Sequence, residues 1–339
     1  MMTEMREKIK KIAVPESPEI PGLIFRSFRG EADFPEMVAV IEGSKKHDQG
    51  ERVFTVEEFS TYFQHLDNCD PYRDMLFAEI DGQVIGYSRV EWQKESRGSY
   101  YYRAWGIILP AWRNQGIGTA MLKYNEKHLR KIAQEHPQGA AKYFRAGASE
   151  NEKEATALLK RFGYQPERYF YDMVRSMGDP LPSAPMPEGL EIRPVTDDQL
   201  PTIFAGLDEA FQDHWGHTPL TENNIKNWMK HPTFNPSLWK VAWEGDQVAG
   251  MVGNFIDQPE NEANNRQRGW TEDIWVRRPW RRQGLARALL VESIQMLEQM
   301  NMTETALGVD TVNPSGALNL YESVGYCKNK LYTVYNKSL

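Results

Sequence analysis

The chain of 339 residues has only two cysteines, Cys69 and Cys327. Two cysteines are too few for a disulfide framework or a cysteine-rich metal site, and we expect no metal centre. The chain also lacks an apolar run of about 18 residues and has a mean hydropathy of −0.62, which excludes a membrane-spanning helix and a membrane partner. Residues 1–11 are charged and lack the apolar core of a signal peptide, which predicts a cytoplasmic protein.

Basic charge is also scarce. The 40 Lys and Arg residues are outnumbered by 47 Asp and Glu residues, for a net charge of −7. A nucleic-acid-binding protein normally presents a basic surface, so this balance argues against a nucleic-acid partner. Hydrophobic content of 40% and aromatic content of 12% are ordinary for a globular protein, and the length allows two domains of average size.

A proline-rich stretch divides the chain near its middle. Residues 176–188 contain four prolines that exclude a helix or a central strand, namely Pro180, Pro182, Pro185 and Pro187. We therefore expect an extended linker between an N-terminal domain over residues 22–175 and a C-terminal domain over residues 189–339. Residues 1–21 form an N-terminal extension.

The two halves repeat one order of predicted elements. Each opens with a strand, continues with helices, and then has a β-hairpin and a third strand. The expected strands cover residues 23–28, 75–80, 83–87 and 100–109 in the first half, and 190–195, 238–243, 247–251 and 270–276 in the second. A helix, a strand, a short helix and a Gly-Tyr pair follow each time. This order predicts an α/β (α+β) fold with a mixed, mostly antiparallel sheet flanked by helices in each half.

A glycine-containing turn leads from the third strand into the next helix. It reads Arg281-x-x-Gly284-x-Ala286 in the second half and Arg113-x-x-Gly116-x-Gly118 in the first. Small residues let a phosphate approach the free N–H groups of the helix's first turn, where the helix dipole favours an anion. Such a turn also arises from helix packing alone. It is not a P-loop, because no Gly-Lys-Ser/Thr follows, and the third glycine of a dinucleotide fingerprint is absent.

In this context the turn resembles the acetyl-CoA site of the GNAT (GCN5-related N-acetyltransferase) family, whose motif is Arg/Gln-x-x-Gly-x-Gly/Ala. The segment from Asn313 to Tyr326 resembles the family's later Asn…Ala…Leu-Tyr-Glu…Gly-Phe motif. The tandem organisation and the sequence Asp213-His-Trp-Gly are similar to mycothiol synthase-like tandem GNAT proteins. The resemblance covers residues 22–175 and 189–337, and implies two tandem GNAT-type domains that use acetyl-CoA.

The resemblance also implies which residues hold acetyl-CoA. In the second half these are Ile274, Val276, Arg281, Arg282, Gln283, Gly284, Leu285, Ala286, Arg287, Asn313 and Ala317. In the first half they are Arg113, Asn114, Gln115, Gly116, Ile117, Gly118 and Thr119. A packing turn that binds nothing is the alternative for the first half.

The halves differ where chemistry takes place. A tyrosine at the position of Tyr321 protonates the departing CoA thiolate in the family, whereas the first half has Leu159 there. Glu272 is the expected base for the ammonium proton, with Asp273 as the alternative. The first half has no carboxylate in the corresponding strand. We therefore expect a catalytic C-terminal domain and a degenerate N-terminal one.

Two further features of this site are predicted. Strand alternation places Trp270, Glu272 and Ile274 on one face unless a bulge intervenes, and backbone N–H groups near Val276 stabilise the oxyanion. Ordinary packing remains the alternative for Tyr321, and a surface or salt-bridged pair for the two carboxylates. His214 and His217 lie in a loop that contacts the acceptor or is simply structural.

The sequence thus predicts an acetyl-CoA-dependent N-acetyltransferase that acts on a primary amine of a small molecule. A mycothiol-precursor amine, an antibiotic, a polyamine and a peptide N-terminus all stay open as acceptors. The alternatives are a non-catalytic acyl-CoA-binding sensor or scaffold, and a transferase for another acyl group. Single-domain relatives bury part of their surface between two chains. Two tandem domains can bury that surface against each other instead, so we expect a monomer or a weak homodimer.

Overall fold

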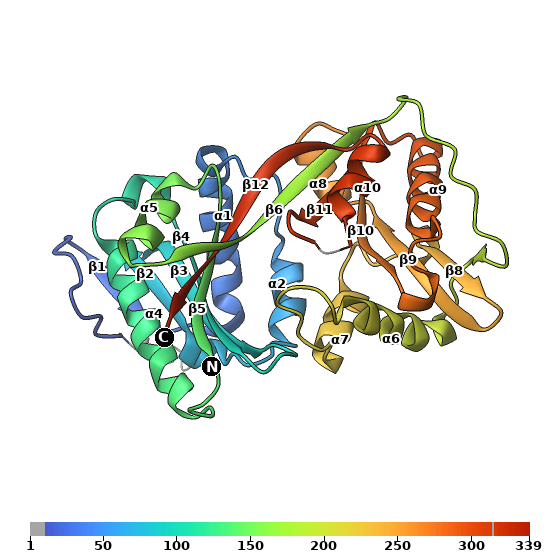
Figure 1. Ribbon diagram of the computed structural model, residues 1–339. Coiled ribbons are helices and arrows are strands. Elements are labelled where there is room, and N and C mark those ends of the chain that lie inside the picture. The colour runs from blue at the N-terminus through green and yellow to red at the C-terminus, as the bar shows by residue number, and fades with distance from the viewer. Residues whose placement is uncertain (1–10, 314) are drawn as a thin grey trace, which may run out of the picture. The chain divides into compact units, whose positions relative to one another are not determined.

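The computed structural model describes residues 11–313 and 315–339 (Figure 1). The first ten residues of the expected extension, and Pro314 in the motif that begins at Asn313, lie outside the described residues. The chain divides into two compact units. The N-terminal unit comprises residues up to Glu167 together with Thr333–Leu339, and the C-terminal unit is Arg168–Tyr332.

The N-terminal unit has a sheet in the order β1-β2-β3-β4-β5, in which only β4 and β5 are parallel. Its strands are β1 (Leu23–Arg26), β2 (Met75–Ile80), β3 (Gln83–Lys94), β4 (Tyr100–Ile108) and β5 (Lys142–Ser149). Its helices are α1 (Phe34–Asp48), α2 (Val56–Phe63), α3 (Pro71–Asp74), α4 (Ile117–Gln134) and α5 (Lys153–Arg161).

The C-terminal unit has the strand order β6-β11-β10-β9-β8-β7, in which β10 and β11 are parallel. Its strands are β6 (Gln165–Ser176), β7 (Glu191–Arg193), β8 (Lys240–Glu244), β9 (Gln247–Phe255), β10 (Arg268–Val276) and β11 (Glu304–Asp310). Its helices are α6 (Leu200–Phe211), α7 (Glu222–Lys230), α8 (Gln258–Ala263), α9 (Leu285–Gln299) and α10 (Ala317–Ser323). The predicted α/β fold, with mixed, mostly antiparallel strands flanked by helices in each half, is confirmed.

Two strands cross the boundaries expected from the sequence. Most of β6 belongs to the C-terminal unit, although it precedes the proline-rich linker, and its residues 170–176 pair with β11. Buried Arg175 holds it there by donating from Nε to the Val324 carbonyl at 2.8 Å. Strand β12 (Cys327–Ser338) begins in the C-terminal unit, and its residues from Thr333 onward belong to the N-terminal unit.

Features fixed by local sequence form as expected. Thr55 and Glu58 make the reciprocal capping-box hydrogen bonds at the start of α2. The two predicted hairpins are β2–β3 and β8–β9. The linker contains neither helix nor strand from Gly178 to Leu190, and its Leu181 and Met186 pack against the core.

Helices cover both faces of the sheet in the C-terminal unit. Helices α9 and α10 pack on one face, in a core that includes Leu289, Leu307 and Tyr321. Helices α6 and α7 pack on the opposite face, against Val248 and Trp275 among others. The candidate site lies where β10 and β11 separate between these two layers.

Candidate functional site

A β-bulge interrupts β10 beside its parallel partner. The pairing of β10 with β11 covers only Arg268–Trp270 and Glu304–Ala306. Farther along β10, Glu272 is opposite Gly253 and the next paired residue is Trp275, while Asp273 has a φ of 48°. A bulge adds a residue to one strand and bends it. The end of β10 is thereby directed away from β11.

Glu272 occupies this opening. Its Oε1 accepts a hydrogen bond of 3.0 Å from the backbone N–H of Gly308, so the side chain is held against β11. Burial, and secondly the charge of Asp273, raise the pKa of Glu272 to about 8, although the Gly308 N–H opposes this shift. Burial raises the pKa of Asp273 to about 6. A carboxyl with a pKa near 8 is suited to exchange a proton at neutral pH.

The bulge also changes which residues share a face. Ile274 and Val276 pack against the core beneath α9 and α10, whereas Trp275 packs on the α6 side. The prediction that Ile274 shares a face with Glu272 held only for a strand without a bulge. Since β10 has the bulge, that prediction is wrong. Arg277 donates its N–H to Ala249 on β9, so the preceding N–H, that of Val276, points to the opposite side of β10. That is the side on which an oxyanion donor is required.

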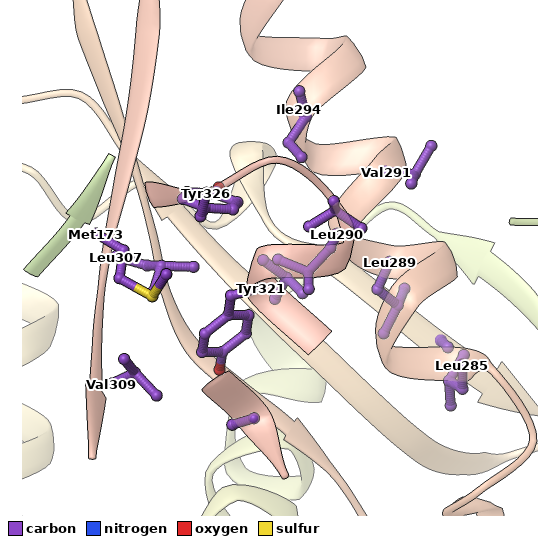
Figure 2. Close-up of a cluster of buried hydrophobic side chains, with 14 of the residues drawn as sticks. Met173, Leu285, Leu289, Leu290, Val291, Ile294, Leu307, Val309, Tyr321 and Tyr326 are labelled. Atoms are coloured by element: carbon purple, nitrogen blue, oxygen red, sulfur yellow. The ribbon is translucent and has the colours of Figure 1, made fainter. Parts of the chain in front are cut away.

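Tyr321 projects from α10 into the core and is 6% exposed. Figure 2 shows its ring between leucines of α9 and residues Leu307 and Val309 of β11. Burial, and secondly the charge of Glu272, raise the pKa of the Tyr321 hydroxyl well above its usual value. The hydroxyl therefore stays protonated at neutral pH. It lies close enough to Glu272 for the charge of that carboxylate to contribute to the raised pKa.

The second-half turn has the backbone geometry that an anion site needs. Gly284 precedes α9 with a φ of 91°, and a Cβ added there would meet no described atom within 4 Å. The helix hydrogen bonds begin with Ala288 donating to Gly284, and no described side chain caps the preceding N–H groups. Arg282, Gln283 and Gly284 are exposed and Ala286 is half-buried. These residues fit a pyrophosphate group.

Arg281 does not present its charge to that turn. It donates to the carbonyls of Val276 at 2.9 Å and Ala210 at 3.1 Å, and to the Asp213 carboxylate at 3.0 Å. Hydrogen bonds from Arg278 and Arg281 lower the pKa of Asp213 to about 2. The Arg281 guanidinium thus fixes the loop that contains Asp213 to the end of β10. The orientation of Arg281 does not support the expected contact with phosphate.

The other predicted cofactor residues fall into two groups. Leu285 and Ala317 are buried in the core, so they can contribute only backbone N–H groups. Arg287 is exposed and reaches Ser323 on α10 at 3.3 Å. Asn313 Oδ1 accepts from the N–H and hydroxyl of Ser315, which shapes the loop before α10.

The N-terminal unit repeats the turn. Arg113 donates to the Ile108 carbonyl at 2.8 Å and pairs with Asp48 through two contacts of 2.6 Å. Gly116 has a φ of 89°, and a Cβ added there would lie 3.3 Å from Pro18. Asn114 and Gln115 are exposed, Gly118 and Thr119 are half-buried, and Ile117 is buried. The turn borders a cleft of about 410 Å³ that is lined by Trp105, Gly106, Asn114, Gly116, Gly118 and Thr119, among others.

The positions predicted to be catalytic are not repeated in the N-terminal unit. Gly86 and Gly250 are equivalent, because a Cβ added to either would lie 2.7 Å from a carbonyl of the next strand. In the N-terminal unit, the residue three positions after the glycine is opposite Trp105 of β4. In the C-terminal unit, the residue three positions after the glycine is opposite Glu272 of β10. The β3–β4 register runs without interruption, so β4 has no counterpart of the Asp273 bulge. Leu159 is buried at the position of Tyr321.

The two loop histidines differ in their contacts. His217 Nε2 lies 3.2 Å from Asp208 of α6, and its side chain is 8% exposed, so it holds the loop to that helix. His214 is half-buried with its ring 4.3 Å from that of Phe211. Burial, and secondly Arg281, lower the pKa of His214.

Sequence reasoning missed Gly308 and the ion pairs of Asp213 with Arg278 and Arg281. Gly308 lies within a strand, and a glycine at such a position often marks a close approach. That signal was available in the sequence. No local signal predicts the contact of Asp213 with Arg281, because the two residues lie 68 positions apart.

Profiles of one family match both halves of the chain. The "Acetyltransferase (GNAT) family" profile matches residues 200–326, and the "Acetyltransferase (GNAT) domain" profile matches residues 71–166. The chain is 26% identical to a mycothiol acetyltransferase of Geodermatophilus obscurus, over 76% of this chain and 80% of that protein. It is 24% identical to one of Salinispora arenicola, over 90% and 94%.

Solved structures share the fold. A GCN5-related N-acetyltransferase from Sphaerobacter thermophilus has a TM-score of 0.71 at 23% identity, and the match covers 96% of this chain and 97% of that one. A tandem GNAT protein from the clavulanic acid biosynthesis pathway has a TM-score of 0.63 at 13% identity, with 93% and 98% covered.

The chain belongs to the GNAT acetyltransferase family and has one GNAT region in each half. It is thus an N-acetyltransferase-family enzyme, and the family implies acetyl-CoA as a substrate. Within residues 11–313 and 315–339, no helix is long and apolar enough to cross a membrane. The same described residues contain no group of three side chains suited to hold a metal ion.

Proposed function

We propose that the C-terminal unit transfers the acetyl group of acetyl-CoA directly to a primary amine of a small molecule. The observation that carries the proposal is the position of Glu272 where β10 leaves β11, held by the Gly308 N–H and with its pKa raised to about 8. The protonated Tyr321, whose pKa the charge of Glu272 helps to raise, is the second group. The N-terminal unit has Trp105 and Leu159 at these two positions and is not catalytic.

Acetyl-CoA supplies the acetyl group as a thioester. Glu272 accepts a proton from the acceptor's ammonium group, and the freed nitrogen attacks the thioester carbonyl carbon. The Val276 N–H stabilises the oxyanion that forms. As the C–S bond breaks, Tyr321 donates its proton to the sulfur, so that CoA leaves as a thiol. The second proton of the attacking nitrogen then passes to the Tyr321 oxygen, and Glu272 releases its proton to solvent, which restores both residues. The pyrophosphate binds at the first turn of α9, near Gly284 and Arg287.

For the N-terminal unit we propose a second acyl-CoA site without turnover, at the turn from Arg113 to Thr119. The cleft of about 410 Å³ beside that turn supports it. For the acceptor, the names of the relatives support a mycothiol-precursor amine. We also propose that the protein is a monomer or a weak homodimer, which sedimentation against the chain mass of 39.2 kDa tests.

Release of free thiol from acetyl-CoA, measured with a panel of primary amines, tests this function. We expect amine-dependent thiol release that Y321F reduces without a change in acetyl-CoA affinity. Binding of acetyl-CoA without thiol release from any amine would instead support the sensor. Faster turnover of succinyl-CoA than of acetyl-CoA would reassign the acyl group.

A further inference from the structure

The cleft of the N-terminal unit lies where β4 and β5 separate. Their parallel pairing ends at Arg103 and Arg145. The residues beyond this point that line the cleft include several with a small side chain or none, namely Ala104, Gly106, Ala146 and Gly147. The cleft is also lined by Asn125 of α4, which is about two helical turns, or roughly 10 Å, farther along that helix than Gly118. It therefore continues from the glycine turn to a far end beside Asn125.

Two buried polar side chains line this far end, Ser88 of β3 and Asn125 of α4. Ser88 is 2% exposed and Asn125 is 5% exposed. The Ser88 hydroxyl donates to Oδ1 of Asn125 at 3.4 Å, which is long for a hydrogen bond from a hydroxyl. The Nδ2 amide of Asn125 donates to none of the described residues. Buried polar groups normally have partners, so this incompletely bonded pair points to a ligand with an oxygen atom.

Gly106 of β4 leaves Ser88 open to the cleft. The two residues are directly opposite each other in the antiparallel β3–β4 pair, so they share one face of the sheet. A Cβ added to Gly106 would lie 3.1 Å from the Cβ of Ser88. A side chain at position 106 would therefore cover the hydroxyl, and the glycine keeps it accessible.

The C-terminal unit has apolar side chains in the same place. The position of Ser88, two residues after the glycine shared by the two hairpins, is occupied there by Val252, which is fully buried. Ile274 of β10 packs against the core that contains Val252. The far end of the N-terminal cleft thus has a hydroxyl and a glycine where the C-terminal unit has two branched apolar side chains.

The polar groups of the two units also differ in their bonding. Asn125 follows the turn glycine Gly116 by nine residues, and Ser293 follows Gly284 by the same number. Ser293 is fully buried and accepts a hydrogen bond of 3.0 Å from Asn254, so its polar group is satisfied within the protein. We therefore expect the two units to accept different acyl groups.

The distribution of charge indicates which kind of oxygen fits. Among the described residues that line the cleft, the cations are Arg113 and Arg161. Arg113 pairs with Asp48, and Arg161 donates to Thr119 in the first turn of α4. Both belong to the turn end of the cleft, so a carboxylate at the far end would be buried without a counter-charge. The far end suits an uncharged oxygen, such as that of a ketone or a hydroxyl.

We propose that the N-terminal unit prefers an acyl-CoA whose acyl chain is longer than acetyl and has an uncharged oxygen, which Asn125 and Ser88 bind. Acetoacetyl-CoA is a member of this class. The inference rests on the proposed acyl-CoA site at the turn from Arg113 to Thr119, and it deepens that proposal by naming the acyl group. The chain then has two acyl-CoA sites of different preference, one for transfer and one for a ligand that is not consumed.

Calorimetric titration of the full-length protein with acetoacetyl-CoA and butyryl-CoA tests the proposal. The two differ at one carbon, which is a ketone in the first and a methylene in the second. The N-terminal site is the one that G116V removes. We expect it to bind acetoacetyl-CoA about ten-fold more tightly than butyryl-CoA or succinyl-CoA, and N125L and S88A to reduce the preference over butyryl-CoA to about two-fold or less. The matched control is S44A, which changes another buried serine of this unit outside the cleft and keeps the preference.

Equal affinity of the N-terminal site for acetoacetyl-CoA and butyryl-CoA would overturn this inference and leave the proposed second site standing. If G116V removes no site for any of these acyl-CoAs, the proposed second site is refuted, and this inference with it. G106A is a further test, because its methyl group covers Ser88. It must lose the preference for acetoacetyl-CoA while it keeps its affinity for free CoA, and an unchanged preference would contradict the assigned position.

Discussion

The backbone N–H of Gly308 donates to Oε1 of Glu272 at 3.0 Å, just beyond the last paired residues of β10 and β11. In a regular parallel pair this N–H would be directed to a backbone carbonyl of the neighbouring strand. Here the bulge at Asp273 takes β10 away, and a side chain fills the vacated position. The distortion that opens the sheet thus also positions Glu272, the proposed base.

The pH dependence of turnover distinguishes Glu272 from Asp273 as the base. The base must be ionised, so the rate rises with pH through its pKa, which is about 8 for Glu272 and about 6 for Asp273. We expect kcat/KM to rise through about pH 8, and E272Q to reduce kcat by about 100-fold or more. The profile is measured with an acceptor whose own pKa lies outside this range. A rise centred near pH 6 that D273N abolishes would move the role to Asp273.

Glu272 also destabilises the fold as the pH rises. Its pKa is raised from an ordinary value of 4.5 to about 8, so the folded state binds the proton more tightly than the unfolded state does. Stability conferred by this group is therefore fully present below pH 4.5 and is lost as the pH rises through 8. We expect the Tm advantage of E272Q over the natural protein to grow across this window and then level off. Thermal unfolding at pH 5 and pH 8.5 measures it, and an equal difference at both values would contradict the raised pKa.

Tyr321 is tested by removing only its hydroxyl. Y321F keeps the ring that packs against Leu289 and Leu307, so we expect little change in Tm and in acetyl-CoA affinity. Loss of the proton donor lowers kcat by about 100-fold. The reciprocal change, L159Y, adds a hydroxyl to the N-terminal unit and gives no activity, because Trp105 stands where a base is needed. Thiol release is the measurement, and full activity of Y321F would remove Tyr321 from the mechanism.

The sequence was sufficient for features that depend on neighbouring residues. The hairpins, the Thr55 capping box and the turns at Gly116 and Gly284 follow from short-range patterns. The Asp273 bulge did not, because it depends on the register between β9 and β10. The pairing of β6 with β11 was equally hidden, since those residues lie more than 100 positions apart in sequence. For that reason the sequence predicted Glu272 as a candidate base but did not predict that β6 joins the C-terminal unit.

The exchange of strands predicts how the chain responds to a cut in its linker. A protease site inserted after Ser183 separates two fragments, yet the first fragment carries the β6 residues that pair with β11 and includes buried Arg175. We expect the fragments to co-purify after cleavage under native conditions and to separate in urea. A similar site after Ser96, which is exposed in the turn between β3 and β4, is the control for cleavage itself. Separation without denaturant would show that β6 contributes little to the C-terminal unit.

Counting acetyl-CoA sites decides the role of the N-terminal turn. Gly284 and Gly116 both have φ near 90°, so a valine at either strains the turn and places a side chain beside the first N–H groups of its helix. We expect two sites by calorimetry, with G284V abolishing the site that supports turnover and G116V abolishing the silent one. Gly98 has a φ of 90° in a hairpin turn away from either site, so G98V reports the cost of backbone strain alone. One site that is lost in G284V and unaffected by G116V would make the N-terminal turn a packing element, and its cleft would then need another ligand.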